Sequence, residues 1–105
     1  MTNQFEPDPD EELIRARLNS ETAKIAWSEL QRFFAAGKTI SVAAELDLID
    51  VAFVFQQDDT ERVQRWMQLG LISPVSDSQA RDWIKQDIIL WSVVVKPWVL
   101  VQSPK

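Results

Sequence analysis

The chain has 105 residues, with 16 Asp and Glu against 11 Lys and Arg, and a formal net charge of −5. It contains no Cys and no His, which excludes disulfides, Cys/His zinc sites and nucleophilic Ser-His-Asp or Cys-His arrangements. The acidic balance argues against a dedicated nucleic-acid-binding protein, whose footprint is usually a basic face. A length near 100 residues predicts one domain.

The charge is distributed unevenly along the chain. Residues 1–12 hold five acids and no base, and residues 45–61 hold six acids and no base. Polar, acidic and proline-rich composition predicts a flexible tail over residues 1–9, followed by a single domain over residues 10–105. The chain has no secretory signal and no apolar run of bilayer-spanning length, so we expect a cytoplasmic protein with no membrane partner.

The longest predicted element is a helix over residues 10–36. Its apolar positions recur at steps of three and four residues, as one face of a helix requires. That face consists of Leu13, Ala16, Ser20, Ala23, Trp27, Leu30 and Phe34. We expect Asp10 to cap the N-terminus and Gly37 to follow the last turn. Asn19 or Ser20 could instead cap a second helix that begins there.

Three shorter stretches are rich in strand-forming residues. Residues 39–42 are β-branched and predict a strand, and residues 71–75 predict another, at a sheet edge or a strand end because of Pro74. The final stretch, residues 90–102, predicts a long strand that is broken or bulged at Pro97. We expect this hydrophobic C-terminal strand to lie at an edge of the sheet.

Polar residues mark the starts of three further helices. These predicted N-caps are Asp47, Asp59 and Ser76. Residues 47–57 favour a helix, although Phe53-Val54-Phe55 leaves a strand open. Gly70 is expected to end the second of these helices, and Gln79 completes a capping box with Ser76. The elements together predict an α+β fold, with a long N-terminal helix and two or three shorter helices on a small, mainly antiparallel sheet of about three strands.

The acidic segment over residues 45–61 is the candidate site for a hard metal ion. Carboxylate oxygens are the ligands that Mg²⁺ and Ca²⁺ prefer, and acids three residues apart share a helix face. The candidate ligands are Asp47, Asp50, Asp58 and Asp59. The competing interpretation, which we favour, makes Asp47 and Asp59 helix caps and the other acids solvated surface. We therefore expect no metal and no cofactor.

A partner-binding site is predicted at Lys96, Pro97 and Trp98. Of the five Trp residues, Trp98 is expected to be the most exposed, because it follows Lys96-Pro97 in the predicted edge strand. An exposed Trp beside a strand edge is a frequent protein-binding arrangement. The alternative is that Trp98 packs on the helices.

Basic residues of the N-terminal helix suggest a weaker, nucleic-acid interpretation. Arg15, Arg17, Lys24 and Arg32 lie there together with Trp27. Glu21 and Glu29 interrupt them, however, which is typical of a salt-bridged outer face. We therefore do not expect nucleic acid to be a partner.

Several stretches resemble a small bacterial family known as domain of unknown function 2288. They are Leu18–Trp27, Leu30–Ala35, Leu46-Asp47-Leu48, Asp58-Asp59 and, most specifically, Val93–Gln102. The resemblance covers nearly the whole chain beyond the acidic N-terminus. It implies a small soluble bacterial domain and supplies no catalytic residue.

The sequence favours a non-enzymatic interaction module that associates with itself or binds another protein. Two features motivate this hypothesis, the heptad-like face of the first helix and the hydrophobic C-terminal strand. One alternative is a divalent-metal-dependent enzyme that uses carboxylates of residues 45–61. A second alternative is a nucleic-acid-associated protein.

Overall fold

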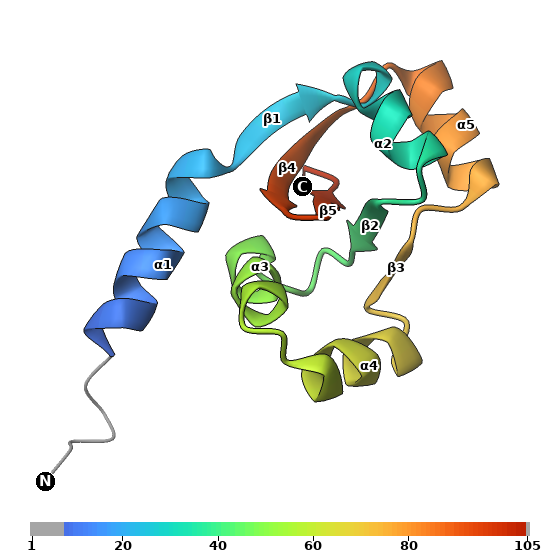
Figure 1. Ribbon diagram of the computed structural model, residues 1–105. Coiled ribbons are helices and arrows are strands. Elements are labelled where there is room, and N and C mark those ends of the chain that lie inside the picture. Colours follow the sequence, from blue (N-terminus) through green and yellow to red (C-terminus); the bar gives the residue numbers. More distant parts are fainter. Residues whose placement is uncertain (1–7, 105) are drawn as a thin grey trace, which may run out of the picture.

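The computed structural model describes residues 8–104, and in that part of the chain a five-stranded sheet lies between two layers of helices (Figure 1). The helical segments are α1 (Pro9–Glu21), the short 3-10 helix η1 (Trp27–Leu30), α2 (Gln31–Ala35), α3 (Leu48–Gln56), α4 (Thr60–Gln68) and α5 (Asp77–Gln86). The strands are β1 (Ala23–Ala26), β2 (Thr39–Val42), β3 (Ile72–Pro74), β4 (Ile89–Val95) and β5 (Trp98–Gln102). The predicted α+β class is confirmed, but the sheet has five strands where about three were expected. None of the helices in this stretch has the length and apolar content that crossing a bilayer requires.

The strands are ordered β1-β4-β5-β2-β3 across the sheet. Neighbouring strands run antiparallel except β2 and β5, which are parallel. Strands β4 and β5 form a hairpin whose two-residue turn, Lys96-Pro97, contains a cis peptide bond. The predicted single strand over residues 90–102 is therefore two strands. Both lie inside the sheet, so the expected C-terminal edge strand is wrong, and the edges are β1 and the Pro74-containing β3.

Strand β5 lies inside the sheet because its side chains are apolar on both faces. Val99 and Val101 contact one layer of helices, Leu100 contacts the other, and each of the three has at most 1% of its surface exposed. A strand with one solvated face alternates apolar and polar residues, whereas a continuous apolar run is typical of a strand covered on both faces. The run that suggested an exposed edge is thus the signature of a central strand.

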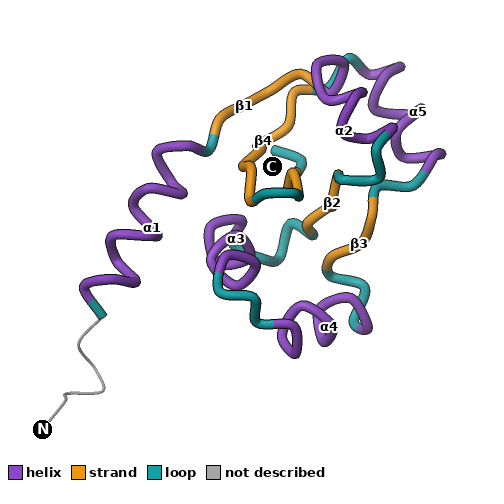
Figure 2. The backbone as a smooth tube through the Cα atoms, viewed as in Figure 1, coloured by secondary structure: helices purple, strands orange, loops and turns teal. Residues whose placement is uncertain are grey.

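Two hydrophobic cores lie on opposite faces of the sheet, as the arrangement of the helices in Figure 2 indicates. The first core joins the sheet to α1 and α3, with α4 packed at its margin, and its buried residues are Leu18, Ile40, Val42, Leu48, Val51, Ala52, Ile72, Val93, Val95 and Leu100. The second core joins the sheet to η1, α2 and α5, and its buried residues are Trp27, Leu30, Val75, Ala80, Trp83, Leu90, Val99 and Val101.

Trp27 occupies the centre of the second core. Its ring makes edge-on contacts with Trp83, at 5.0 Å between ring centroids, and with Phe34, at 5.5 Å. Its Nε1–H donates a hydrogen bond of 3.1 Å to the carbonyl of Ala80. Edge-on aromatic pairs add to the stability that area burial provides, and a buried indole N–H needs such a partner. The sequence correctly placed Trp27 in the interior.

The predicted single helix over residues 10–36 is wrong, because α1 ends before Thr22 and the chain continues as β1, η1 and α2. The Oγ1 of Thr22 donates to the carbonyl of Leu18 at 2.7 Å, and its N–H donates to the carbonyl of Asn19 at 3.2 Å. These two bonds occupy carbonyls at the end of the helix. A second helix capped by Asn19 or Ser20 is not formed.

Long-range packing explains why the helical spacing was misleading. Pairing of β1 with β4 carries Ile25 and Trp27 into the second core, which a straight continuation of α1 could not reach. On α1 itself, Leu18 is buried against α3, whereas Leu13 is 72% exposed. Tertiary burial has overridden local periodicity here.

The start of α1 also differs from the expectation. Asp8 is the N-cap, because its carboxylate accepts a hydrogen bond of 2.9 Å from the N–H of Asp10, the residue predicted to be the cap. Pro9 occupies the first helical position, where its missing N–H costs nothing. Residues 1–7 of the predicted acidic tail lie outside the described residues, and Pro9 is already helical.

The remaining helix signals are confirmed. Asp47, Asp59 and Ser76 each accept a hydrogen bond from a backbone N–H in the first turn of α3, α4 and α5, respectively. Residues 48–56 are helical, as favoured over a strand. Gly37 and Gly70 follow α2 and α4 with φ of 73°, a backbone conformation that glycine adopts freely. The capping box is half formed, because the side chain of Gln79 donates to the Oγ of Ser41 at 3.2 Å.

Replacing Trp27 tests its place in the second core. Trp27→Phe removes buried volume and the indole hydrogen bond to the carbonyl of Ala80, so we expect a loss of about 2 kcal/mol or more in the free energy of unfolding. Trp66→Phe is the matched control, since Trp66 is only half-buried on α4 and should lose less than half as much. Urea denaturation of the two variants measures the difference. An equal loss would contradict the central role of Trp27.

The end of α5 offers a second stability test. Asp87 has φ of 51° and ends the helix, with its N–H donating to the carbonyl of Ile84 at 3.1 Å. Asp87→Gly should raise the unfolding free energy by about 0.5–1 kcal/mol, because glycine adopts this conformation without strain. Asp87→Val should lower it by about 1–2 kcal/mol. Calorimetric melting of the two variants should therefore move in opposite directions, and shifts of the same sign would refute the explanation.

Candidate functional site

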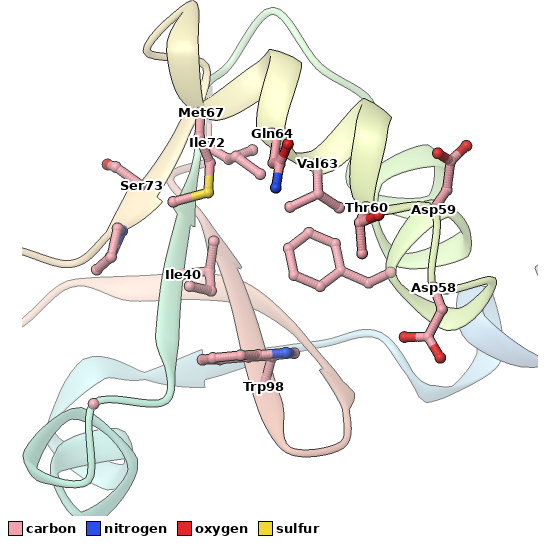
Figure 3. A pocket seen from close by; sticks show the side chains of 13 residues that line it. Ile40, Asp58, Asp59, Thr60, Val63, Gln64, Met67, Ile72, Ser73 and Trp98 are labelled. Atoms are coloured by element: carbon pink, nitrogen blue, oxygen red, sulfur yellow. The ribbon is translucent and has the colours of Figure 1, made fainter.

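A cavity of about 410 Å³ lies between α4 and the sheet face that carries the first core (Figure 3). Its apolar side chains come from five different elements and are those of Ile40, Phe55, Val63, Met67, Ile72, Pro74 and Trp98. The volume falls within the range of about 300–1,000 Å³ that is common for small-molecule sites. We refer to this cavity as the Trp98 pocket.

The floor of the Trp98 pocket is set by the register of the sheet. Trp98 pairs with Val95 across the hairpin and so lies on the same sheet face as Leu100, two residues further along β5. Ile40 pairs with Leu100 and lies beside Trp98 in Figure 3. Lys38 places its Nζ 5.4 Å from the centroid of the Trp98 ring. The indole is thus positioned by the sheet, contacts a neighbouring cation and lines the cavity.

Helix α4 forms the roof of the pocket. Val63, Gln64 and Met67 project from it above Ile40 and Trp98 (Figure 3). Val63 and Met67 are four residues apart and therefore lie on the same face of the helix. No residue of α4 is fully buried, and Met67 is 47% exposed. The roof is consequently held by partial apolar contacts and leaves an opening over the floor.

The rim of the pocket carries Asp58 and Asp59, which are the only charged lining residues in the described part of the chain. Both lie in the connection between α3 and α4, where Asp58 has φ of 54° and Asp59 accepts a hydrogen bond of 3.2 Å from the N–H of Arg62. In Figure 3 their carboxylates lie at one end of the cavity and point away from its middle. The pocket thus combines an apolar centre with a negatively charged end.

The chemistry of the lining suits binding. Besides the two carboxylates, the polar groups are the hydroxyls of Thr60 and Ser73 and the amide of Gln64. None of these hydroxyls is hydrogen-bonded to a carboxylate or another base among the described residues, the contact by which a nucleophile is activated. The large apolar surface, by contrast, is what a hydrophobic group needs in order to leave water.

The four aspartates predicted as metal ligands fall into separate places. Asp47 caps α3, and Asp50 forms an ion pair with Arg15 of α1. The hydrogen bond and charge of Asp50 raise the pKa of Arg15, against the opposing effect of partial burial. Asp58 and Asp59 lie together at the pocket rim. Among residues 8–104, no three His, Cys, Asp or Glu side chains are grouped so that they could hold a metal ion.

The predicted partner-binding residues lie at the β4–β5 turn and at the pocket. Lys96 and Pro97 are exposed in the turn, and Trp98 is half-buried. Trp98 packs against the first core and also lines the pocket. Its role in binding a partner stays a prediction. Trp98 is not the most exposed Trp, because Trp91 on β4 is 38% exposed.

The roof of the pocket was not predicted from the sequence. Ile40 and Ile72 were expected only as strand residues, and Val63 and Met67 only as the apolar side of a helix. The four-residue spacing of Val63 and Met67 does indicate one shared face. Nothing in the sequence indicates that this face stands opposite Trp98, because the two segments are about 30 residues apart and meet through the sheet.

The roles of the aspartates can be separated by their isosteres. Asp47→Ala should lower the unfolding free energy by about 1 kcal/mol, because the first turn of α3 loses its cap, whereas Asp47→Asn should change it little, since Asn caps equally well. Chemical denaturation at neutral pH measures both. A large loss in Asp47→Asn would mean that the charge of Asp47, and not its cap, stabilises the fold.

Comparisons with known proteins agree with the fold and leave the activity open. The sequence profile described as "Protein of unknown function (DUF2288)" matches residues 13–103. Among solved structures, the chain is similar to the NMR solution structure of PA1075 from Pseudomonas aeruginosa, with 40% sequence identity and a TM-score of 0.78 over 100% of this chain and 94% of that chain. A search of the curated proteins found no match. The chain therefore belongs to the family of proteins of unknown function DUF2288.

Proposed function

We propose that the protein is a non-catalytic binding module whose Trp98 pocket receives an apolar side chain of a protein partner. The observation that carries this proposal is the apolar cavity of about 410 Å³ beside the half-buried Trp98. Trp residues in pockets are frequent centres of binding energy at protein interfaces. The thioether of Met67 adds a flexible, polarisable group that adapts to different apolar side chains.

The size of the pocket supports an aromatic anchor. An apolar cavity of about 150 Å³ is large enough to bind benzene. A cavity of about 410 Å³ therefore has room for a fused-ring side chain such as Trp, or for one aromatic and one aliphatic side chain together. Met67, Ile40 and Trp98 would then contact the anchor from above and below.

The strand order favours a different protein as partner over a second copy of the chain. Self-association was suggested by a heptad-like face and by a C-terminal edge strand, and the structure contains neither. The edge strand β3 has three residues and ends at Pro74, and the edge strand β1 carries Lys24. Short strands, prolines and lysines at edges are features that discourage pairing between copies.

The energy available from one anchor points to a modest affinity. An aromatic side chain buries about 150–250 Å², which corresponds to about 4–6 kcal/mol at about 25 cal/mol per Å². A Kd of about 1 μM requires about 8 kcal/mol, in addition to the cost of lost rotational and translational freedom. Contacts around the rim of the pocket therefore have to supply the remainder.

A library of random linear peptides, selected on the immobilised protein, tests the proposal. Selected peptides should share an aromatic or aliphatic anchor, and titration with them should shift the NMR signal of the Trp98 indole N–H. Met67→Asp should weaken their binding at least tenfold, about 1.4 kcal/mol, because it places a carboxylate in the apolar roof.

Ile84→Asp is the matched control for that variant. Ile84 is 47% exposed, as Met67 is, but it lies on α5 on the other side of the sheet. This control should bind the selected peptides as the unchanged protein does. Peptides that bind Met67→Asp and the unchanged protein equally would overturn the proposal.

A further inference from the structure

We infer that the partner segment carries Lys or Arg next to its apolar anchor, and that Asp58 and Asp59 recognise this positive charge. The inference rests on the proposed function, because it specifies the partner of the same pocket. Its basis is charge complementarity, since within residues 8–104 these two carboxylates are the only charged side chains that line the Trp98 pocket.

The negative charge at this end of the pocket is not neutralised by the described residues. Among them, neither Asp58 nor Asp59 has a basic group within the 4.0 Å that defines an ion pair. Arg17 and Lys96 line a neighbouring hollow together with Asp58, without forming an ion pair with it. The acid Glu61 follows directly on α4 and adds to the same charge.

The basic residue closest along the chain, Arg62, contacts an aromatic ring outside the pocket. The guanidinium of Arg62 lies over the ring of Trp66, 5.8 Å from its centroid, and these two residues line a separate hollow with Glu61 and Arg65. Lys38 places its Nζ over the ring of Trp98 and is not among the described residues that line the pocket. Of the other acids of the segment 45–61, Asp50 forms an ion pair with Arg15, and Asp47 caps α3 as Asp59 caps α4. Asp58, Asp59 and Glu61 form no ion pair among the described residues and lie close together in the sequence, so negative charge is concentrated at the rim.

The geometry separates the two parts of the ligand. The carboxylates lie at one end of the cavity and point away from its middle (Figure 3), so a cation would sit at that end while the apolar anchor occupies the space over Trp98. A residue adjacent to the anchor has this reach, because consecutive Cα atoms are about 3.8 Å apart. An acidic segment would meet repulsion at the same place.

The size of the effect follows from the exposure of the carboxylates. Asp58 is exposed and Asp59 half-buried, and exposed ion pairs contribute little individually. Two such pairs should strengthen binding by about threefold to tenfold at low salt and less at high salt. Their main effect is on orientation and on the rate of association.

Three short peptides with one anchor test the inference: Gly-Trp-Lys-Lys, Gly-Trp-Gln-Gln and Gly-Trp-Glu-Glu. Their affinities are measured by NMR titration at low and high NaCl concentration. We expect the Lys peptide to bind about threefold to tenfold tighter than the Gln peptide at low salt, and the Glu peptide to bind more weakly than the Gln peptide. High salt should reduce both differences.

The protein variant that isolates the charge is Asp58→Asn with Asp59→Asn. Asn caps a helix as Asp does and tolerates a positive φ, so the cap of α4 and the turn at Asp58 are kept. In this variant the affinity of the Lys peptide should no longer exceed that of the Gln peptide. The matched control is Asp82→Asn with Asp87→Asn, which removes two charges from the opposite layer, and Asp87 also has a positive φ. In this control the Lys peptide should still bind more tightly than the Gln peptide.

The outcomes distinguish this inference from the function on which it rests. If the Gln peptide binds and Met67→Asp prevents it, but the Lys peptide gains nothing, the inference is refuted and the binding module stands. If no anchor peptide shifts the Trp98 signal, both fall. If the Trp98 signal shifts with the concentration of the protein alone, the pocket binds a second copy of the chain, and the inference is refuted. The inference is also refuted if free indole binds the pocket and none of the peptides does.

Discussion

Burial of β5 on both faces is the constraint on which the rest of the structure depends. Val99 and Val101 require one layer of helices and Leu100 requires another, so the chain must cover this strand from two sides. Trp98 begins the same strand, at the margin of the first layer, where it faces α4, a helix with no fully buried residue. The pocket thus forms because β5 begins, at Trp98, beyond the part of the strand that the first core buries completely.

Local signals in the sequence identified those elements whose ends are determined by neighbouring residues. Asp47, Asp59 and Ser76 cap helices, and Gly70 follows one, because these interactions span only a few residues. The boundary at Thr22 could not be predicted in this way. There, the competing state is a strand whose partner β4 lies almost 70 residues further along the chain, and periodicity alone carries no information about that pairing.

The candidate site shows the same division between local and long-range information. Trp98 was selected from the sequence as a binding residue for the wrong reason, because β5 is an inner strand and not an edge. It lines a pocket since its register directs it toward α4. Asp58 and Asp59 were singled out for metal chemistry, and their shared place at the rim depends on their adjacency alone. The roof of the pocket, with Val63 and Met67, is positioned by the packing of the whole domain.

The order of strands has a consequence for how the chain acquires its structure during synthesis. The sheet is completed by β5, the last element of the described chain. Strand β1 pairs with β4, and β2 pairs with β5, so each pairing joins residues that are 60 or more positions apart. Contacts of such sequence separation slow folding. When the ribosome has produced the chain through α5, the apolar surfaces of both layers still lack β4 and β5, the strands that lie between them. Folding of the N-terminal half must wait for the C-terminal hairpin, and until then these surfaces depend on protection from aggregation.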